Sequence, residues 1–214
     1  MQLLKIGLVA LLGFVLFGCS SKSIVPVVSL NTSFGNYTIG GKTNNSSTTD
    51  YRSNFDISNA CSIYKANPHW RKEVLKSSRK WGTPEHIFLS IIKQESSFKP
   101  NAQPLNKKGK PISSAYGISQ ALKGTWLTYQ RNTGNHSHRR ASFGDSVNFM
   151  GWYFHESHKQ LRISKWDIKN QYLAYHEGWG GFKRRNYRKK KWLMKVAAGL
   201  ENQAWKYKKQ LERC

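Results

Sequence analysis

Apolar residues recur at helical spacing from about residue 61 to the C-terminus. The first stripe contains three bulky residues, Trp70, Val74 and Trp81. Gly82 follows directly, and a glycine in this position is typical of a helix end. The pattern therefore predicts a helix that ends near residue 81.

The next stripe ends on a carboxylate. Thr83-Pro84 is typical of a helix start, with the threonine as N-cap and the proline in the first turn. One face then carries Phe88, Ile91, Ile92 and Glu95. Glu95 should therefore project from the apolar side of its helix rather than from the solvated side. Pro100 limits the helix.

The remaining chain predicts further helices and at most a small β-hairpin. Two Ser-x-x-Asp pairs, Ser142 with Asp145 and Ser164 with Asp167, are typical of helix starts. Apolar stripes follow over 143–161 and 168–175, and a last one combines Trp192, Val196, Leu200 and Tyr207. Gly and Pro at 104–111 favour a hairpin over Lys107 to Ile112, and a short helix is expected near Thr125. The predicted fold class is mainly α.

The N-terminus follows a different pattern. Lys5 precedes an apolar run of about a dozen residues, which is too short to span a bilayer comfortably and has the form of a secretory signal. The run ends in Leu16-Phe17-Gly18-Cys19, which resembles a bacterial lipobox. The resemblance implies that residues 1–18 are removed and that Cys19 carries lipid. An ordinary signal with a chance cysteine is the alternative.

The position after the lipidated cysteine bears on localisation. Ser20 stands there instead of Asp, which favours an outer-membrane lipoprotein that faces the periplasm, if the host is Gram-negative. Residues 19–58 are rich in Ser, Thr, Asn and Gly and can build little core, so a flexible tether is expected. Residues 59–214 then form the folded domain.

Two cysteines remain if Cys19 is lipidated. Cys61 and Cys214 lie near the start of the folded part and at the last residue. In an exported protein, a disulfide between them is the simplest expectation, and two unrelated thiols are the alternative.

The chain is strongly basic, with 35 Lys and Arg residues against 11 Asp and Glu residues and a formal net charge of +24. Such a charge acts on anionic partners. For an exported lipoprotein these are anionic lipids and the carboxylates of peptidoglycan, and nucleic acid is not expected. Residues 183–191, KRRNYRKKK, could bind wall carboxylates or anionic lipid, or could be a solvated run of charge.

The placement of Glu95 suggests a chemical role. A carboxyl group on an apolar face is partly desolvated, which disfavours its charged form and raises its pKa. An acid that keeps its proton near neutral pH can protonate a glycosidic oxygen. The alternative is a glutamate at a frayed helix end that faces solvent.

Three segments then carry a family resemblance. QESSFKPNA (94–102), AYGISQ (115–120) and LAYHEGWGGF (173–182) resemble, in the same order, three motifs of the lytic transglycosylase domain of the lysozyme-like superfamily. The resemblance implies a helical fold like that of goose-type lysozyme and peptidoglycan as the partner. It covers roughly residues 65–182.

The resemblance also implies roles for single residues. Glu95 would be the general acid/base, and Ser96 would support it or contact substrate. Gly117 and Gln120 would line the cleft, with the Gln120 amide bonding to sugar or peptide. Tyr175 would orient the Glu95 carboxyl through its hydroxyl.

Other positions of the same motifs are expected near the substrate, namely Tyr116, His176 and Glu177. The sequence also departs from the family pattern. Ile118 and Ser119 replace Leu and Met, and His176 and Glu177 replace Asn and a usually small residue. These departures put the fine substrate contacts in question.

The implied reaction is cleavage of the MurNAc–GlcNAc β-1,4 bond by one glutamate, with a 1,6-anhydromuramoyl product. A goose-type hydrolase that uses Glu177 as a second carboxylate is an alternative, because glycoside hydrolases generally need two. An inactive peptidoglycan-binding lipoprotein is another. No cofactor is expected, and no metal, because His155-Glu156-x-His158 lacks zinc-helix spacing. A monomer is expected.

Overall fold

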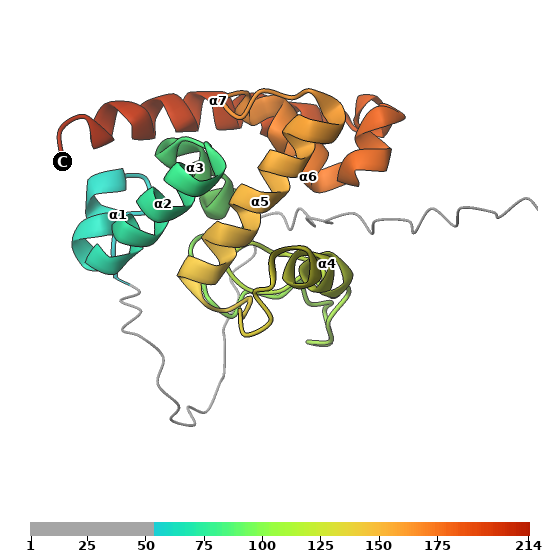
Figure 1. The fold of residues 1–214 in the computed structure, drawn as a ribbon, viewed down its shortest axis with the longest axis horizontal. Helices are drawn as coiled ribbons and strands as arrows, with labels where there is room; N and C mark the ends of the chain where they lie inside the picture. Colours follow the sequence, from blue (N-terminus) through green and yellow to red (C-terminus); the bar gives the residue numbers. More distant parts are fainter. Residues whose placement is uncertain (1–53) are drawn as a thin grey trace, which may run out of the picture.

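A computed structural model describes residues 54–214 of the chain, and these residues are mainly helical (Figure 1). The elements are α1 Ala60–Ala66, α2 Pro68–Trp81, α3 Glu85–Ser96, α4 Lys123–Thr133, α5 Phe143–Leu161, α6 Ile168–Lys183, the 3₁₀ helix η1 Asn186–Lys189 and α7 Lys191–Leu211. The predicted mainly α fold class is confirmed. The signal segment, Cys19 and most of the expected tether lie outside the described residues. Of the helices within 54–214, none is long and apolar enough to cross a membrane.

Helix α5 forms the centre of the core. It crosses the middle of the molecule in Figure 1, between α2 on one side and α6 on the other, with α4 beside its first half. Its side chains at 149, 150, 153 and 154 are fully buried. Helix α7 lies across α3 and α6 and covers one face of the domain. Phe55 and Ile57, just before the expected domain start at 59, also pack on the core.

The helix ends follow the sequence signals only in part. Gly82 ends α2 in the left-handed conformation, at φ 76°, as predicted. Ser142 caps α5 by accepting from the Asp145 N–H. The predicted Thr83 cap is wrong, because Pro84 takes the N-cap position and α3 begins at Glu85. Asp167, and not Ser164, caps α6 by accepting from the Asn170 N–H.

Helix α7 differs from its predicted phase by one residue at its start. Trp192 is 41% exposed, whereas Leu193 is fully buried. Leu200 and Tyr207 point into the core as predicted. The Trp192 ring packs edge-to-face with the His176 ring of α6, 5.2 Å between centroids, and Leu193 takes the core position.

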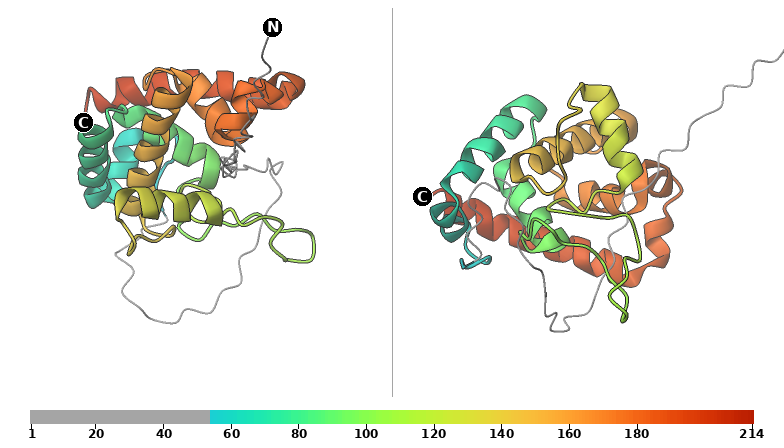
Figure 2. Two further views of the ribbon diagram at one scale, coloured as in Figure 1. Left: turned by 45° about the vertical axis from the view of Figure 1, so that its right-hand side comes forward. Right: turned by 90° about the horizontal axis from the view of Figure 1, so that it is seen from below.

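The expected hairpin is present as a narrow projecting loop (Figure 2, left). The Asn106 N–H donates to the Lys110 carbonyl, and the Ile112 N–H donates to the Pro104 carbonyl. The Asn106 side-chain oxygen closes the turn by accepting from the N–H groups of Lys108 and Lys110, each at 2.9 Å. Pairing is limited to one isolated bridge, between Leu105 and Pro111.

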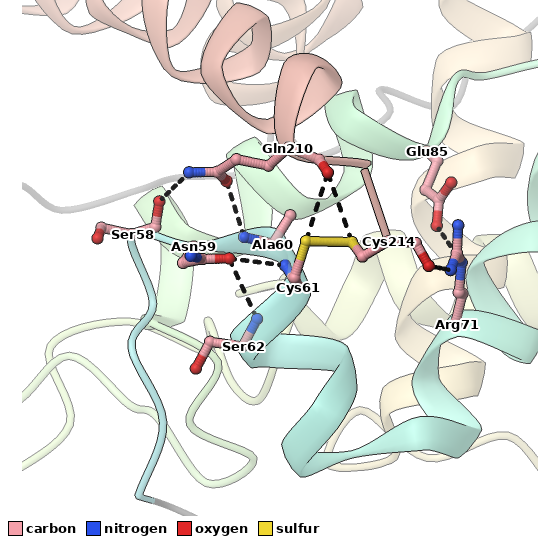
Figure 3. The surroundings of a disulfide bond; sticks show 9 residues. All are labelled: Ser58, Asn59, Ala60, Cys61, Ser62, Arg71, Glu85, Gln210 and Cys214. Atoms are coloured by element: carbon pink, nitrogen blue, oxygen red, sulfur yellow. Dashed lines mark hydrogen bonds and ion pairs between the residues drawn. A yellow bond between two sulfur atoms is a disulfide. The ribbon is translucent and has the colours of Figure 1, made fainter. Parts of the chain in front are cut away.

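A disulfide joins the two ends of the domain, as predicted from the cysteine positions. Cys61 in α1 is bonded to Cys214, 153 residues away (Figure 3). The Gln210 side chain supports the junction, since its oxygen accepts from the Ala60 N–H at 2.8 Å and its amide donates to the Ser58 carbonyl at 3.2 Å. The Arg71 guanidinium donates to the Cys214 carbonyl at 2.6 Å.

Removal of this disulfide should destabilise the domain. We expect the double substitution Cys61→Ser with Cys214→Ser to lower the free energy of unfolding by about 2–5 kcal/mol, because the unfolded chain loses a constraint on a very long loop. Urea denaturation of the two proteins measures the difference. Reductant should cause the same loss in the natural chain and none in the double variant; a further loss in the double variant would contradict the assignment.

Candidate active site

Glu95 lies in the last turn of α3, next to the fully buried Ile91 and Ile92. The residue as a whole is half-buried, but both of its carboxylate oxygens are shielded from solvent. The helical phase predicted this placement, since it put Glu95 at the end of the apolar face. The carboxyl group therefore sits in a partly desolvated position at the point where the chain leaves the helix.

The chain leaves α3 through two residues in the left-handed region. Ser97 has φ 50° and Phe98 has φ 64°, a conformation that is unfavourable for residues other than glycine. Phe98 is fully buried and stacks on Trp70, with ring centroids 5.8 Å apart. Phe55 approaches the same ring edge-on at 6.0 Å. Burial of the Phe98 ring offsets the backbone strain and fixes the exit of the chain beside Glu95.

Ser96 is buried, and its hydroxyl donates to the Ile92 carbonyl of its own helix at 3.3 Å. This bond satisfies the hydroxyl within α3. The structure therefore gives Ser96 a local role at the helix end, next to Glu95.

The second motif forms a tight turn that packs on the chain after α3. Gly117 has φ 79°, and a Cβ on it would lie 2.0 Å from the Arg140 carbonyl oxygen. The Gly117 N–H donates to the Ala102 carbonyl at 2.8 Å. A glycine is required here by close backbone approach, and Gly117 is buried in the turn.

Gln120 is committed to the same turn. Its side-chain amide donates to two backbone carbonyls, of Ala102 and Gly117, each at 2.8 Å. Its two N–H donors are therefore used within the protein. Both amide hydrogens of Gln120 bond to the backbone in this structure, and the amide hydrogen bond to sugar or peptide that the resemblance implies stays a prediction.

Tyr116 lies at the edge of this turn and is half-buried. Its hydroxyl donates to the Asn101 side-chain oxygen at 2.9 Å, and the Arg140 guanidinium lies over its ring at 5.3 Å. Arg140 also donates to the Ala121 carbonyl at 2.9 Å. No sequence motif indicated this role of Arg140, which stands next to another arginine and after two histidines.

Tyr175 joins the third motif to the second. Its ring is fully buried in α6 and packs edge-on against Tyr153 at 5.1 Å. Its hydroxyl donates to the Ser119 carbonyl at 2.6 Å. Burial, and then the nearby charge of Glu95, hold the pKa of the Tyr175 hydroxyl well above its usual value. Tyr175 is therefore near Glu95 as expected. Its own proton goes to the Ser119 carbonyl, and the expected orientation of the Glu95 carboxyl by the Tyr175 hydroxyl stays a prediction.

His176 and Glu177 form a buried polar group at a bend of α6. Glu177 Oε1 accepts from the Lys190 ammonium at 2.7 Å and lies 2.9 Å from His176 Nδ1. Both side chains are only 4% exposed. Gly178 bends the helix directly after them, with φ 71° and ψ 160°. These two side chains of α6 are buried against the start of α7 and do not lie on an open surface.

The three motifs thus converge although they are far apart in sequence. The Ala102 carbonyl accepts from the second motif, and the Ser119 carbonyl accepts from the third. Glu95 lies where these connections meet. Two cavities lined by described residues lie elsewhere. One of about 160 Å³ lies between the second half of α2 and the start of α5, and one of about 340 Å³ lies beside the ends of α5 and α6. Among residues 54–214, no group of three or more His, Cys, Asp or Glu side chains is placed to hold a metal ion.

A helical domain with one shielded glutamate at the meeting point of three such motifs defines a lysozyme-like class of protein. The family described as "Transglycosylase SLT domain" matches residues 7–214, and the chain belongs to this family. Membership implies transglycosylase activity on peptidoglycan in general terms. No curated protein and no solved structure matches the chain.

The turn at Gly117 can be tested with a matched glycine. We expect Gly109→Ala to lower the free energy of unfolding by about 1 kcal/mol, because its φ of 72° is unfavourable for alanine but its surroundings are open. Gly117→Ala, at a similar φ, should cost at least about 2 kcal/mol more, because its Cβ meets the Arg140 backbone. Urea denaturation gives both values, and equal losses would contradict the close approach.

Proposed function

We propose that the chain is a peptidoglycan lytic transglycosylase that cleaves the MurNAc–GlcNAc β-1,4 bond with Glu95 as its single acid/base. The main support is the shielding of both Glu95 oxygens at the end of α3, close to the buried Tyr175. Shielding from water favours the neutral carboxylic acid, which is the form that can donate a proton to a leaving oxygen.

The proposed reaction uses this one group twice. Glu95 first gives its proton to the glycosidic oxygen while the bond from that oxygen to muramoyl C1 breaks. The carboxylate then takes the proton of the muramoyl C6 hydroxyl, and the C6 oxygen forms a bond to C1. The product is a 1,6-anhydromuramoyl end, the acid is regenerated, and no water is consumed.

The state of Glu177 argues against the hydrolase alternative. Its carboxylate is buried and lies against the Lys190 ammonium and His176. A second catalytic carboxylate would have to activate water or attack the sugar, and an ion pair competes with both tasks. We therefore assign Glu177 to the connection between α6 and α7.

The departures from the family pattern at positions 118 and 119 give little support to the alternative of an inactive protein. Ile118 and Ser119 are both fully buried, beneath the turn of the second motif. Their replacement of the family's Leu and Met changes packing in this chain rather than an exposed substrate surface.

The proposed location follows from the N-terminal sequence. We propose that lipid on Cys19 anchors the chain in the outer membrane, with the domain facing the periplasm and acting as a monomer. Residues 19–58 would allow the domain to reach peptidoglycan away from the bilayer, since a chain of that length extends to about 125 Å when stretched.

Replacement of the proposed acid should remove activity without unfolding the domain. We expect Glu95→Gln to reduce the release of soluble muropeptides from sacculi by roughly a hundredfold to ten-thousandfold, because glutamine keeps the shape but cannot transfer the proton. Chromatography of the released fragments measures the loss, and thermal unfolding checks the fold.

Glu156 provides the matched control. It lies on α5 and pairs with Lys159 at 3.2 Å, so Glu156→Gln makes the same chemical change away from the motifs. This control should keep its activity. A fully active Glu95→Gln protein would rule out the proposed role.

A further inference from the structure

The connection between α6 and α7 concentrates positive charge at one end of the molecule. The chain turns sharply through η1 at the right-hand end of Figure 1. This segment, residues 183–191, is named the basic corner, and its cations are Lys183, Arg184, Arg185, Arg188, Lys189, Lys190 and Lys191.

Most of this charge is not neutralised by the protein. Lys190 pairs with Glu177. The other six cations are exposed, and within residues 54–214 none of them forms an ion pair. Like charges held this close repel one another and create a strong local positive potential. The basic corner is therefore suited to an anionic partner.

A shallow groove adds an apolar component to this surface. It has a volume of about 340 Å³, and its lining is Gln160, Leu161, Phe182, Lys183, Arg185 and Tyr187. The Phe182 and Tyr187 rings lie together, 5.1 Å between centroids. Lys183 and Arg185 are exposed at its rim, and no acidic side chain lines it. Trp192, 41% exposed, follows at the start of α7.

This combination favours a membrane surface over a purely ionic polymer. Aromatic rings beside Lys and Arg are typical of protein segments at the level of lipid headgroups. Guanidinium groups bind phosphate with two parallel hydrogen bonds. A carboxylate polymer would satisfy the cations but would leave the aromatic groove without an apolar partner. We propose that the basic corner docks on the phosphate headgroups of an anionic membrane, with Phe182 and Tyr187 at the level of the headgroups.

The geometry of the chain permits this contact. Helix α7 has 21 residues, so about 30 Å separate the basic corner from the disulfide at its far end, where the domain begins. The 42 peptide units from Cys19 to Cys61 can extend beyond about 100 Å. A domain held by lipid on Cys19 could therefore turn its basic corner to the same membrane.

Sedimentation with lipid vesicles tests the proposal on the full-length chain carrying Cys19→Ser, so that no acyl group contributes. One vesicle type contains phosphatidylcholine alone, and the other contains phosphatidylcholine with phosphatidylglycerol. The apolar N-terminus contributes to binding of both types, so the measured quantity is the excess affinity for the anionic vesicles.

The corner variant combines Lys183→Gln, Arg185→Gln and Arg188→Gln. The control combines Lys107→Gln, Lys108→Gln and Lys110→Gln in the exposed hairpin and removes the same charge. We expect each removed cation to lower the excess affinity about fivefold, so the corner variant should lose roughly a hundredfold. The hairpin control should change it by less than about threefold, as expected for distant, screened charges.

Three results would overturn the proposal. Unchanged binding by the corner variant would show that the corner is not the docking surface. Equal losses in both variants would show that net charge alone drives binding. A loss of binding to isolated sacculi with unchanged binding to vesicles would assign the corner to the wall polymer. Thermal unfolding of both variants confirms that each remains folded.

Discussion

A buried hydrogen bond from the Tyr175 hydroxyl to the Ser119 carbonyl holds the site together. It fastens α6 to the turn that follows α3, and the same turn is fastened to the chain beyond Glu95 through the Ala102 carbonyl. A break in either connection would free the turn between them. The position of Glu95 therefore depends on backbone carbonyls as much as on its own helix.

The motif residues therefore have different roles. Gly117, Gln120 and Tyr175 hold backbone in place, and Phe98 fixes the chain where it leaves α3 in a strained conformation. Glu95 is the carboxylate that these contacts hold at the end of α3. Several residues therefore serve to position one reactive group, as expected for a reaction that depends on a single acid/base.

The sequence predicted the features that depend on local periodicity. It did not predict the hydrogen bonds to backbone groups that are distant in the sequence. The phase of α3 was sufficient to place Glu95 at the end of an apolar face, and the cysteine positions were sufficient to predict the disulfide. The donors of Gln120 could not be assigned, because the carbonyls that accept from them are brought together only by the tertiary fold. In α7, the apolar stripe predicted Trp192 in the core, but Leu193 is buried there and the Trp192 ring packs on His176 of α6.

The proposed catalytic route rests on Glu95 working without a second carboxylate and without water. Mass spectrometry of the fragments released from sacculi tests this claim most directly. We predict muramoyl ends one water lighter than the hydrated form, which is the mass of a 1,6-anhydro ring. Hydrated ends alone would contradict the claim and would return Glu177 to consideration as a second catalytic group.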